Sequence, residues 1–114
     1  MALTEDQIAL AQWLFEPIIQ GPIKAGVGAK VRHGIRFEGP SIILFESFPH
    51  FQHRSKWQDH DVAKFRFYKS RQAWYLYCKF GDDKWHSYEP MPESPELVDL
   101  VNEVDRDPTH IFWG

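Results

Sequence analysis

Apolar residues recur at helical spacing near both ends of the chain. Thr4 and Gln7 form a capping-box pattern, so we expect a helix after Thr4 that is apolar around most of its circumference. Pro17 predicts a kink or an end of this helix, because the proline ring clashes with the carbonyl four residues earlier. Near the other end, Ser94 is the expected N-cap of a second helix. The apolar stripe of this second helix consists of Leu97, Leu100, Val101 and Val104.

Between the two helices, apolar residues alternate with polar ones, which is typical of half-buried strands. Residues 41–45 are apolar on both faces, which indicates a strand in the middle of a sheet. Residues 48–61 break the alternation, and we expect an irregular loop there. The predicted strands are residues 31–37, 41–45, 63–67, 74–80 and 85–89.

This order of elements predicts a single α+β domain over residues 1–114. It consists of an N-terminal helix, a five-stranded and largely antiparallel meander sheet, and a C-terminal helix. The strands are joined mostly by short turns, so neighbours in the sequence are expected to be neighbours in the sheet. The two helices are expected to cover one face of it.

Composition excludes several classes of protein. The hydrophobic fraction of 43% and the charged fraction of 25% are ordinary for a globular domain. Cys78 is the only cysteine, so no internal disulfide forms, and we expect a reducing cytoplasm. The N-terminal segment carries acids and lacks the positive region of a signal peptide. No apolar run reaches the length of a membrane span, so we expect no membrane partner.

Positive charge gathers in the predicted sheet. Residues 30–80 carry ten Lys and Arg against four acids, whereas residues 81–114 carry two against nine. Cations and tyrosines on one face of a sheet are typical of proteins that bind single-stranded nucleic acid. The sequence pI of about 6.0 favours a solvated or protein-facing sheet instead. The candidate nucleic-acid residues are Arg32, Arg36, Lys64, Arg66, Tyr75, Tyr77 and Lys79.

The predicted loop holds a cluster of imidazoles and carboxylates. His50 and His53 have a spacing that can chelate a metal ion, and His60 follows between two aspartates. If a zinc ion binds, these three histidines are the expected ligands. A solvated loop is the competing interpretation, because surface loops collect polar residues.

The residues favour a protein without enzymatic activity. Cys78 and His33 fall on the apolar side of their strands, so both are expected in the core rather than at a reactive site. His86 and Glu89 lie close in sequence but on opposite sides of a strand. No nucleophile–base order, nucleotide-binding loop or metalloprotease helix occurs.

The chain has more apolar surface than one small core needs. Its aromatic share is 16%, and it ends on a run of large apolar side chains, Ile111, Phe112 and Trp113. We expect this tail to dock on the fold, with a contact to another chain as the alternative. The favoured function is therefore a protein-interaction or oligomerisation module, most simply a homodimer, because a second copy buries such a surface.

The sequence resembles the family called domain of unknown function 3024. The matching residues are the stretch Trp85-His86-Ser87-Tyr88-Glu89-Pro90, the pair Asp107-Pro108 and the terminal Ile111-Phe112-Trp113-Gly114. The similarity covers about residues 8–114, and Cys78 stands where the family pattern has a tryptophan. The resemblance implies a bacterial and cytoplasmic protein. It brings no activity, cofactor or catalytic residue with it.

Overall fold

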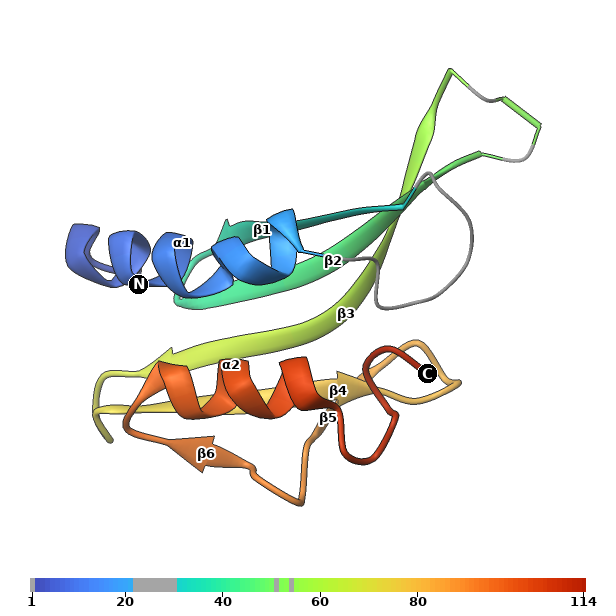
Figure 1. The fold of residues 1–114 in the computed structure, drawn as a ribbon. Coiled ribbons are helices and arrows are strands. Elements are labelled where there is room, and N and C mark those ends of the chain that lie inside the picture. Colours follow the sequence, from blue (N-terminus) through green and yellow to red (C-terminus); the bar gives the residue numbers. More distant parts are fainter. Residues whose placement is uncertain (1, 22–30, 51, 54) are drawn as a thin grey trace.

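The computed structural model describes residues 2–21, 31–50, 52–53 and 55–114. It has an α+β fold in which an antiparallel sheet lies between an N-terminal and a C-terminal helix in the sequence (Figure 1). The elements are α1 (Glu5–Gln20), β1 (Arg32–Glu38), β2 (Ser41–Pro49), β3 (Trp57–Tyr68), β4 (Ala73–Lys79), β5 (Trp85–Ser87), β6 (Glu93–Ser94) and α2 (Leu97–Arg106).

The sheet is a meander, as predicted. The strands follow the order β1-β2-β3-β4-β5, and each adjacent pair is antiparallel. The sequence did not predict β6, which has two residues and pairs with the start of β4, on the same edge as β5. No helix in the described part of the chain is long and apolar enough to cross a membrane.

The start of α1 confirms the predicted capping box. The Gln7 backbone N–H donates to the Thr4 hydroxyl at 3.1 Å, and the Thr4 N–H donates to the Gln7 side chain at 2.9 Å. The predicted end at Pro17 is wrong, because the helix continues to Gln20. Pro17 lies on the exposed side of the helix, where water can bond to the carbonyl that the proline leaves without a partner.

The start of α2 also differs from the prediction. Ser94 belongs to β6, and the N-cap position is taken by Glu96, whose side chain makes no capping bond. Ser94 still helps the chain to enter the helix, because its hydroxyl accepts the Glu96 N–H at 3.1 Å and donates to Asp99 at 2.8 Å. The predicted apolar stripe is confirmed, since all four of its residues are buried.

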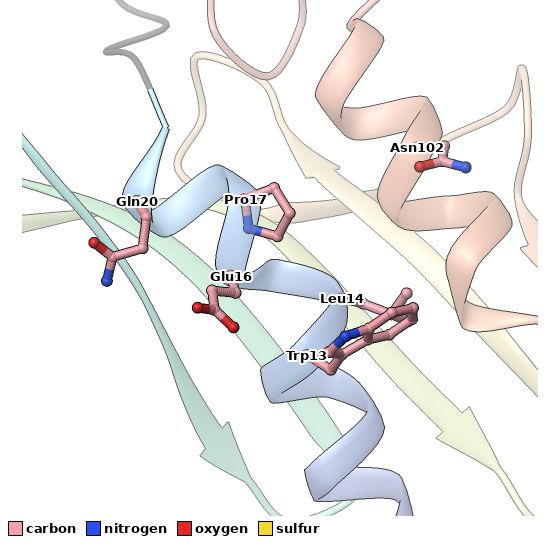
Figure 2. A pocket seen from close by; sticks show the side chains of 6 residues that line it. All are labelled: Trp13, Leu14, Glu16, Pro17, Gln20 and Asn102. Atoms are coloured by element: carbon pink, nitrogen blue, oxygen red, sulfur yellow. The ribbon is translucent and has the colours of Figure 1, made fainter.

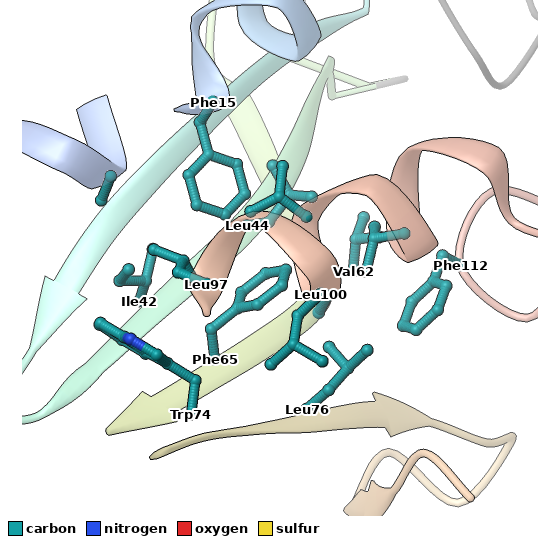
Figure 3. Packing of buried hydrophobic residues seen from close by; sticks show 14 of the residues in the cluster. Phe15, Ile42, Leu44, Val62, Phe65, Trp74, Leu76, Leu97, Leu100 and Phe112 are labelled. Atoms are coloured by element: carbon teal, nitrogen blue, oxygen red, sulfur yellow. The ribbon is translucent and has the colours of Figure 1, made fainter. Parts of the chain in front are cut away.

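Both helices pack on the same face of the sheet, and the core lies between them and the strands (Figures 1 and 3). Phe15 of α1 meets Phe65 of β3 edge to face, with ring centroids 5.1 Å apart. Leu100 of α2 and Leu76 of β4 are fully buried in the same cluster. The opposite face, here called the outer face, carries neither helix.

Strands occupy both ends of the predicted irregular loop at residues 48–61. β2 continues to Pro49 and β3 begins at Trp57, so the two strands form a long hairpin that extends beyond the helices (Figure 1). Residues 57–60 are all exposed. A strand without a buried side shows no apolar alternation, which is why the sequence pattern missed it.

A register shift in the same hairpin also interrupts the apolar alternation of β3. Leu44 pairs with Ala63 and Phe45 pairs with Asp61, so Val62 is an extra residue in β3. Val62 and Ala63 are both buried. Two successive buried residues break the period of two at this point.

The C-terminal tail docks on its own chain, as predicted. Phe112 is only 6% exposed and packs against Tyr88, with ring centroids 4.9 Å apart. Asp107 ends α2 in the left-handed conformation, and its carboxylate accepts the N–H groups of Phe112 and Trp113 at 3.1 and 2.9 Å. The Trp113 indole N–H donates to the carbonyl of Val104 at 2.9 Å.

Candidate functional site

The outer face of the sheet collects cations and aromatic rings. Directly paired residues of antiparallel strands share a face, and the pairing places Arg36, Ile43, Lys64 and Tyr77 in one row across four strands. The next residues on the same side of β3 and β4 follow the same rule. All seven candidate nucleic-acid residues therefore lie on this face: Arg32, Arg36, Lys64, Arg66, Tyr75, Tyr77 and Lys79.

Six cations of the described part of the chain lie near aromatic rings on this face. The pairs are Arg32 with Trp57, Arg36 with Phe45, Lys64 with Tyr77, Arg66 with Tyr68, Arg71 with Tyr75, and Lys79 with Trp85. The distances to the ring centroids run from 3.5 Å for the first pair to 6.0 Å for the second. Six such contacts among the described residues therefore lie on this one face.

The middle of the face is a cluster of Lys64, Arg66, Tyr68, Tyr75 and Tyr77, here called the tyrosine–cation cluster. The Tyr68 and Tyr77 hydroxyls lie 3.0 Å apart, and the Tyr68 and Tyr75 rings meet edge to face with centroids 4.7 Å apart. Burial, together with the bond to Tyr68, raises the pKa of Tyr77 to about 12. This phenol therefore stays neutral at physiological pH and keeps a proton to donate.

The cations of the cluster have no acidic partner within the described part of the chain. The ion pairs there include neither Lys64 nor Arg66. The Nε of Arg66 is buried and, among the described residues, has no hydrogen-bond acceptor. Positive charge is therefore not cancelled locally in the middle of the face.

The cations at the side of the cluster are neutralised. Both terminal nitrogens of Arg36 bond to the Asp61 carboxylate, at 2.7 and 2.9 Å, and its Nε bonds to Glu38. The Arg36 guanidinium lowers the pKa of Asp61, and Asp61 in turn raises the pKa of Arg36. Lys79 also lies 4.0 Å from Asp61 and 3.2 Å from Asp83. Arg36 and Lys79 are thus neutralised by acids, whereas Lys64 and Arg66 are not.

Sequence reasoning missed part of this face. Trp57 falls in the segment for which the sequence predicts a loop, and Arg71 lies in the turn between β3 and β4, where no strand parity applies. Tyr68 is different, because it continues the same alternation as Lys64 and Arg66. That alternation was a usable signal for Tyr68.

The three candidate zinc ligands are not brought together. His50 and His53 lie near the hairpin tip with ring centroids 5.5 Å apart, whereas His60 is on β3 and pairs with Glu46. The Nδ1 of His50 accepts the N–H groups of Gln52 and His53. Among the described residues no three such side chains are arranged to hold a metal ion. Zinc binding stays a prediction, to be tested by elemental analysis of protein purified without a histidine tag.

Of the candidate reactive residues, Cys78 and His33 lie inside the fold, whereas His86 is partly exposed. Cys78 is 2% exposed, and burial raises the pKa of its thiol, which makes the thiolate scarce. His33 is buried with its Nε2 4.0 Å from Glu46 and its ring against Trp113. His86 stacks on Phe80 and bonds to the Asp82 carboxylate at 2.8 Å.

A second surface lies on the helix side of the molecule. An open hollow of about 510 Å³ between α1 and α2 is lined by Trp13, Leu14, Glu16, Pro17, Gln20 and Asn102 (Figure 2). Trp13 stands at its rim and is 70% exposed. Leu10 of α1 and Val98 of α2 are also exposed, so this side displays apolar groups that the fold does not cover.

Comparison with known proteins gives a family and no closer relative. Neither the curated proteins nor the solved structures contain a match to this chain. A family model described as domain of unknown function (DUF3024) matches residues 4–114, which is nearly the whole chain. In the terminal Ile-Phe-Trp-Gly, which belongs to this resemblance, the three apolar side chains pack against the core of the fold. The chain belongs to the DUF3024 family.

Proposed function

We propose that this protein is a binding module without enzymatic activity, and that the outer face of its sheet binds single-stranded nucleic acid. The tyrosine–cation cluster is the observation that carries the proposal. Three aromatic rings and two cations without acidic partners lie on adjacent strands of one open face. Unpaired bases stack on such rings while the cations contact the phosphates.

The charge of the cluster favours a polyanion over a second copy of the chain. In a two-fold interface between outer faces, Lys64 and Arg66 of one copy would approach the same cations of the other, and like charges repel. A nucleic acid brings the opposite charge and planar rings together. A single strand fits better than a duplex because its bases are free to stack.

The geometry of β4 sets the spacing between the tyrosine rings on which bases would stack. Tyr75 and Tyr77 are two residues apart on β4 and therefore stand about 7 Å apart along the strand. Each stacked base would contribute about 1–3 kcal/mol. Each phosphate contact would add about −0.7 to the slope of log affinity against log salt concentration.

The test is the affinity for fluorescently labelled single-stranded oligonucleotides, measured by anisotropy at several salt concentrations. Tyr75→Ala is expected to weaken binding about tenfold. Lys64→Gln is expected to weaken it for every sequence and to flatten the salt dependence by about 0.7. Arg106→Gln is the matched control, because this exposed cation lies on α2, on the other side of the sheet. No binding of the wild-type protein at low salt would disprove this function.

The hollow between α1 and α2 supports a second candidate function, self-association as a homodimer. Trp13 projects next to a hollow that is lined by Leu14, Pro17 and Asn102 (Figure 2). A projecting ring beside a hollow is self-complementary under a two-fold axis, because each copy can insert its ring into the other. The expected partner at this surface is therefore a second copy of the chain.

Light scattering across a range of protein concentrations tests the homodimer. The wild-type protein is expected to approach twice the monomer mass, and Trp13→Ser is expected to stay monomeric. Trp57→Ser is the control, because it removes another exposed tryptophan from the opposite side of the sheet. A monomer mass at every concentration would rule out self-association and make a different protein the candidate partner.

A further inference from the structure

A polar hollow adjoins the tyrosine–cation cluster at the end of the sheet. It has a volume of about 420 Å³ and is open to solvent. Its walls come from the turn between β3 and β4, the start of β4, and the segment around β6. The residues that line it are Arg71, Ala73, Tyr75, Glu93, Ser94 and Pro95.

The donor side of the hollow is held in place by the turn. Arg71 donates a hydrogen bond from its guanidinium to the Tyr75 hydroxyl at 2.8 Å. Its backbone N–H donates to the carbonyl of Tyr68 at 3.1 Å. Gln72 follows in the left-handed conformation, and its side-chain amide donates to the carbonyl of Lys69 at 2.8 Å. The guanidinium is therefore positioned beside Tyr75 before any ligand arrives.

The acceptor side of the hollow comes from β6. Glu93 pairs directly with Tyr75 across the sheet, so both side chains emerge on the outer face. Glu93 is exposed, and its carboxylate has no hydrogen bond or ion pair among the described residues. The hollow thus presents a guanidinium fork, an aromatic ring and a carboxylate with both of its oxygens available.

These three groups match one nucleobase better than the others. Guanine carries two adjacent donors, N1–H and the N2 amino group, which can bond to both oxygens of one carboxylate. It also carries two adjacent acceptors, O6 and N7, which match the fork of an arginine. Adenine and cytosine offer a carboxylate one amino group beside a ring acceptor, and uracil and thymine offer a single ring N–H.

We infer that this hollow is a base-specific subsite that holds a guanine of the bound single strand, with Glu93 on its Watson–Crick edge, Arg71 on O6 or N7, and Tyr75 beside its ring. The inference rests on the proposed function. Glu93 disfavours phosphate by its charge, so it contributes preference for one base rather than general affinity. Lys64 and Arg66 supply the affinity that is independent of sequence.

The experiment compares short thymidine oligonucleotides in which one central base is thymine, adenine, cytosine, guanine or hypoxanthine. Wild-type protein is expected to bind the guanine strand about tenfold more tightly than the others, as one good bidentate contact provides. Hypoxanthine lacks the N2 amino group and is expected to lose most of that preference. Glu93→Gln is expected to remove the preference while it leaves affinity for the all-thymidine strand unchanged or stronger.

Glu5→Gln is the matched control, because it removes one exposed acidic charge from α1 on the far side of the sheet. It is expected to keep the guanine preference, and circular dichroism shows whether each variant is folded. Equal affinity for all five strands, or a guanine preference that survives in Glu93→Gln, would overturn the subsite and leave the nucleic-acid function in place. Failure to bind any of the strands would overturn both.

Discussion

Removal of residues 111–114 is expected to lower the stability of the fold sharply. The deletion removes Phe112, which is 6% exposed, and the half-buried Ile111 and Trp113. It also leaves the Asp107 carboxylate, which is 5% exposed, without the two backbone N–H groups that it accepts.

The size of the effect follows from these contacts. Full burial of Phe112 contributes about 1.5–3 kcal/mol, and the two half-buried side chains together contribute about as much. The Trp113–Val104 hydrogen bond adds about 1 kcal/mol. Loss of both N–H donors to the buried Asp107 carboxylate costs a further 1–3 kcal/mol, roughly. Ordering three residues opposes this by about 3–5 kcal/mol. The net loss is about 3 kcal/mol, which corresponds to a fall in Tm of about 10 °C.

Urea denaturation and thermal scans of the truncated protein measure this loss. Deletion of Gly114 alone is the control, because this residue is exposed and a side chain there would touch nothing within 4 Å. Unchanged urea and thermal midpoints after removal of residues 111–114 would refute the reasoning. A change in light-scattering mass with unchanged midpoints would mean that the tail acts in association rather than in folding.

Three further predictions concern Glu46, Gly34 and Cys78. Burial raises the pKa of the Glu46 carboxyl above its ordinary value of 4.5, so its stabilising contribution is complete below pH 4.5 and is lost as pH rises through the raised pKa. Glu46→Gln should therefore flatten the pH dependence of the free energy of unfolding above pH 4.5. Identical plots of this free energy against pH for the two proteins would contradict this account. Gly34→Ala should destabilise the fold by about 1–3 kcal/mol, because a Cβ there would lie 2.7 Å from the Phe45 ring; unchanged urea stability would mean that the ring moves aside freely. Cys78 should react with a thiol reagent much more slowly in the native protein than in urea, because the thiol is buried and its pKa is raised. Equal rates would show that the strand opens readily.

Much of the outer face could be predicted from the sequence, because alternation in a strand records on which side each residue lies. Lys64 and Arg66 alternate with buried residues of β3, and Tyr75 and Tyr77 do the same in β4. That pattern alone predicted that these cations and rings share a face. It could not predict which of the cations would be neutralised, because the bond between Arg36 and Asp61 joins residues that are 25 positions apart.

The polar hollow was beyond prediction from the sequence. Glu93 faces Tyr75 only because β6 returns to the edge of β4, and a strand of two residues has no periodicity to detect. Arg71 comes from a turn, where no alternation says which way a side chain points. The hollow therefore exists only through the tertiary arrangement of three separate segments.

For the fold, the sequence by itself determined the start of α1, the stripe of α2, the order of the main strands and the burial of the tail, though not whether the tail packs on its own chain. Each of these depends on local spacing or on large apolar side chains that water excludes. The tertiary structure alone decided that α1 continues past Pro17, that β2 and β3 extend into the predicted loop, and that β6 forms. These features depend on solvent exposure and on strand pairing with distant segments. The local pattern of hydrophobic and polar residues records neither the exposure of a segment nor its pairing with a distant strand.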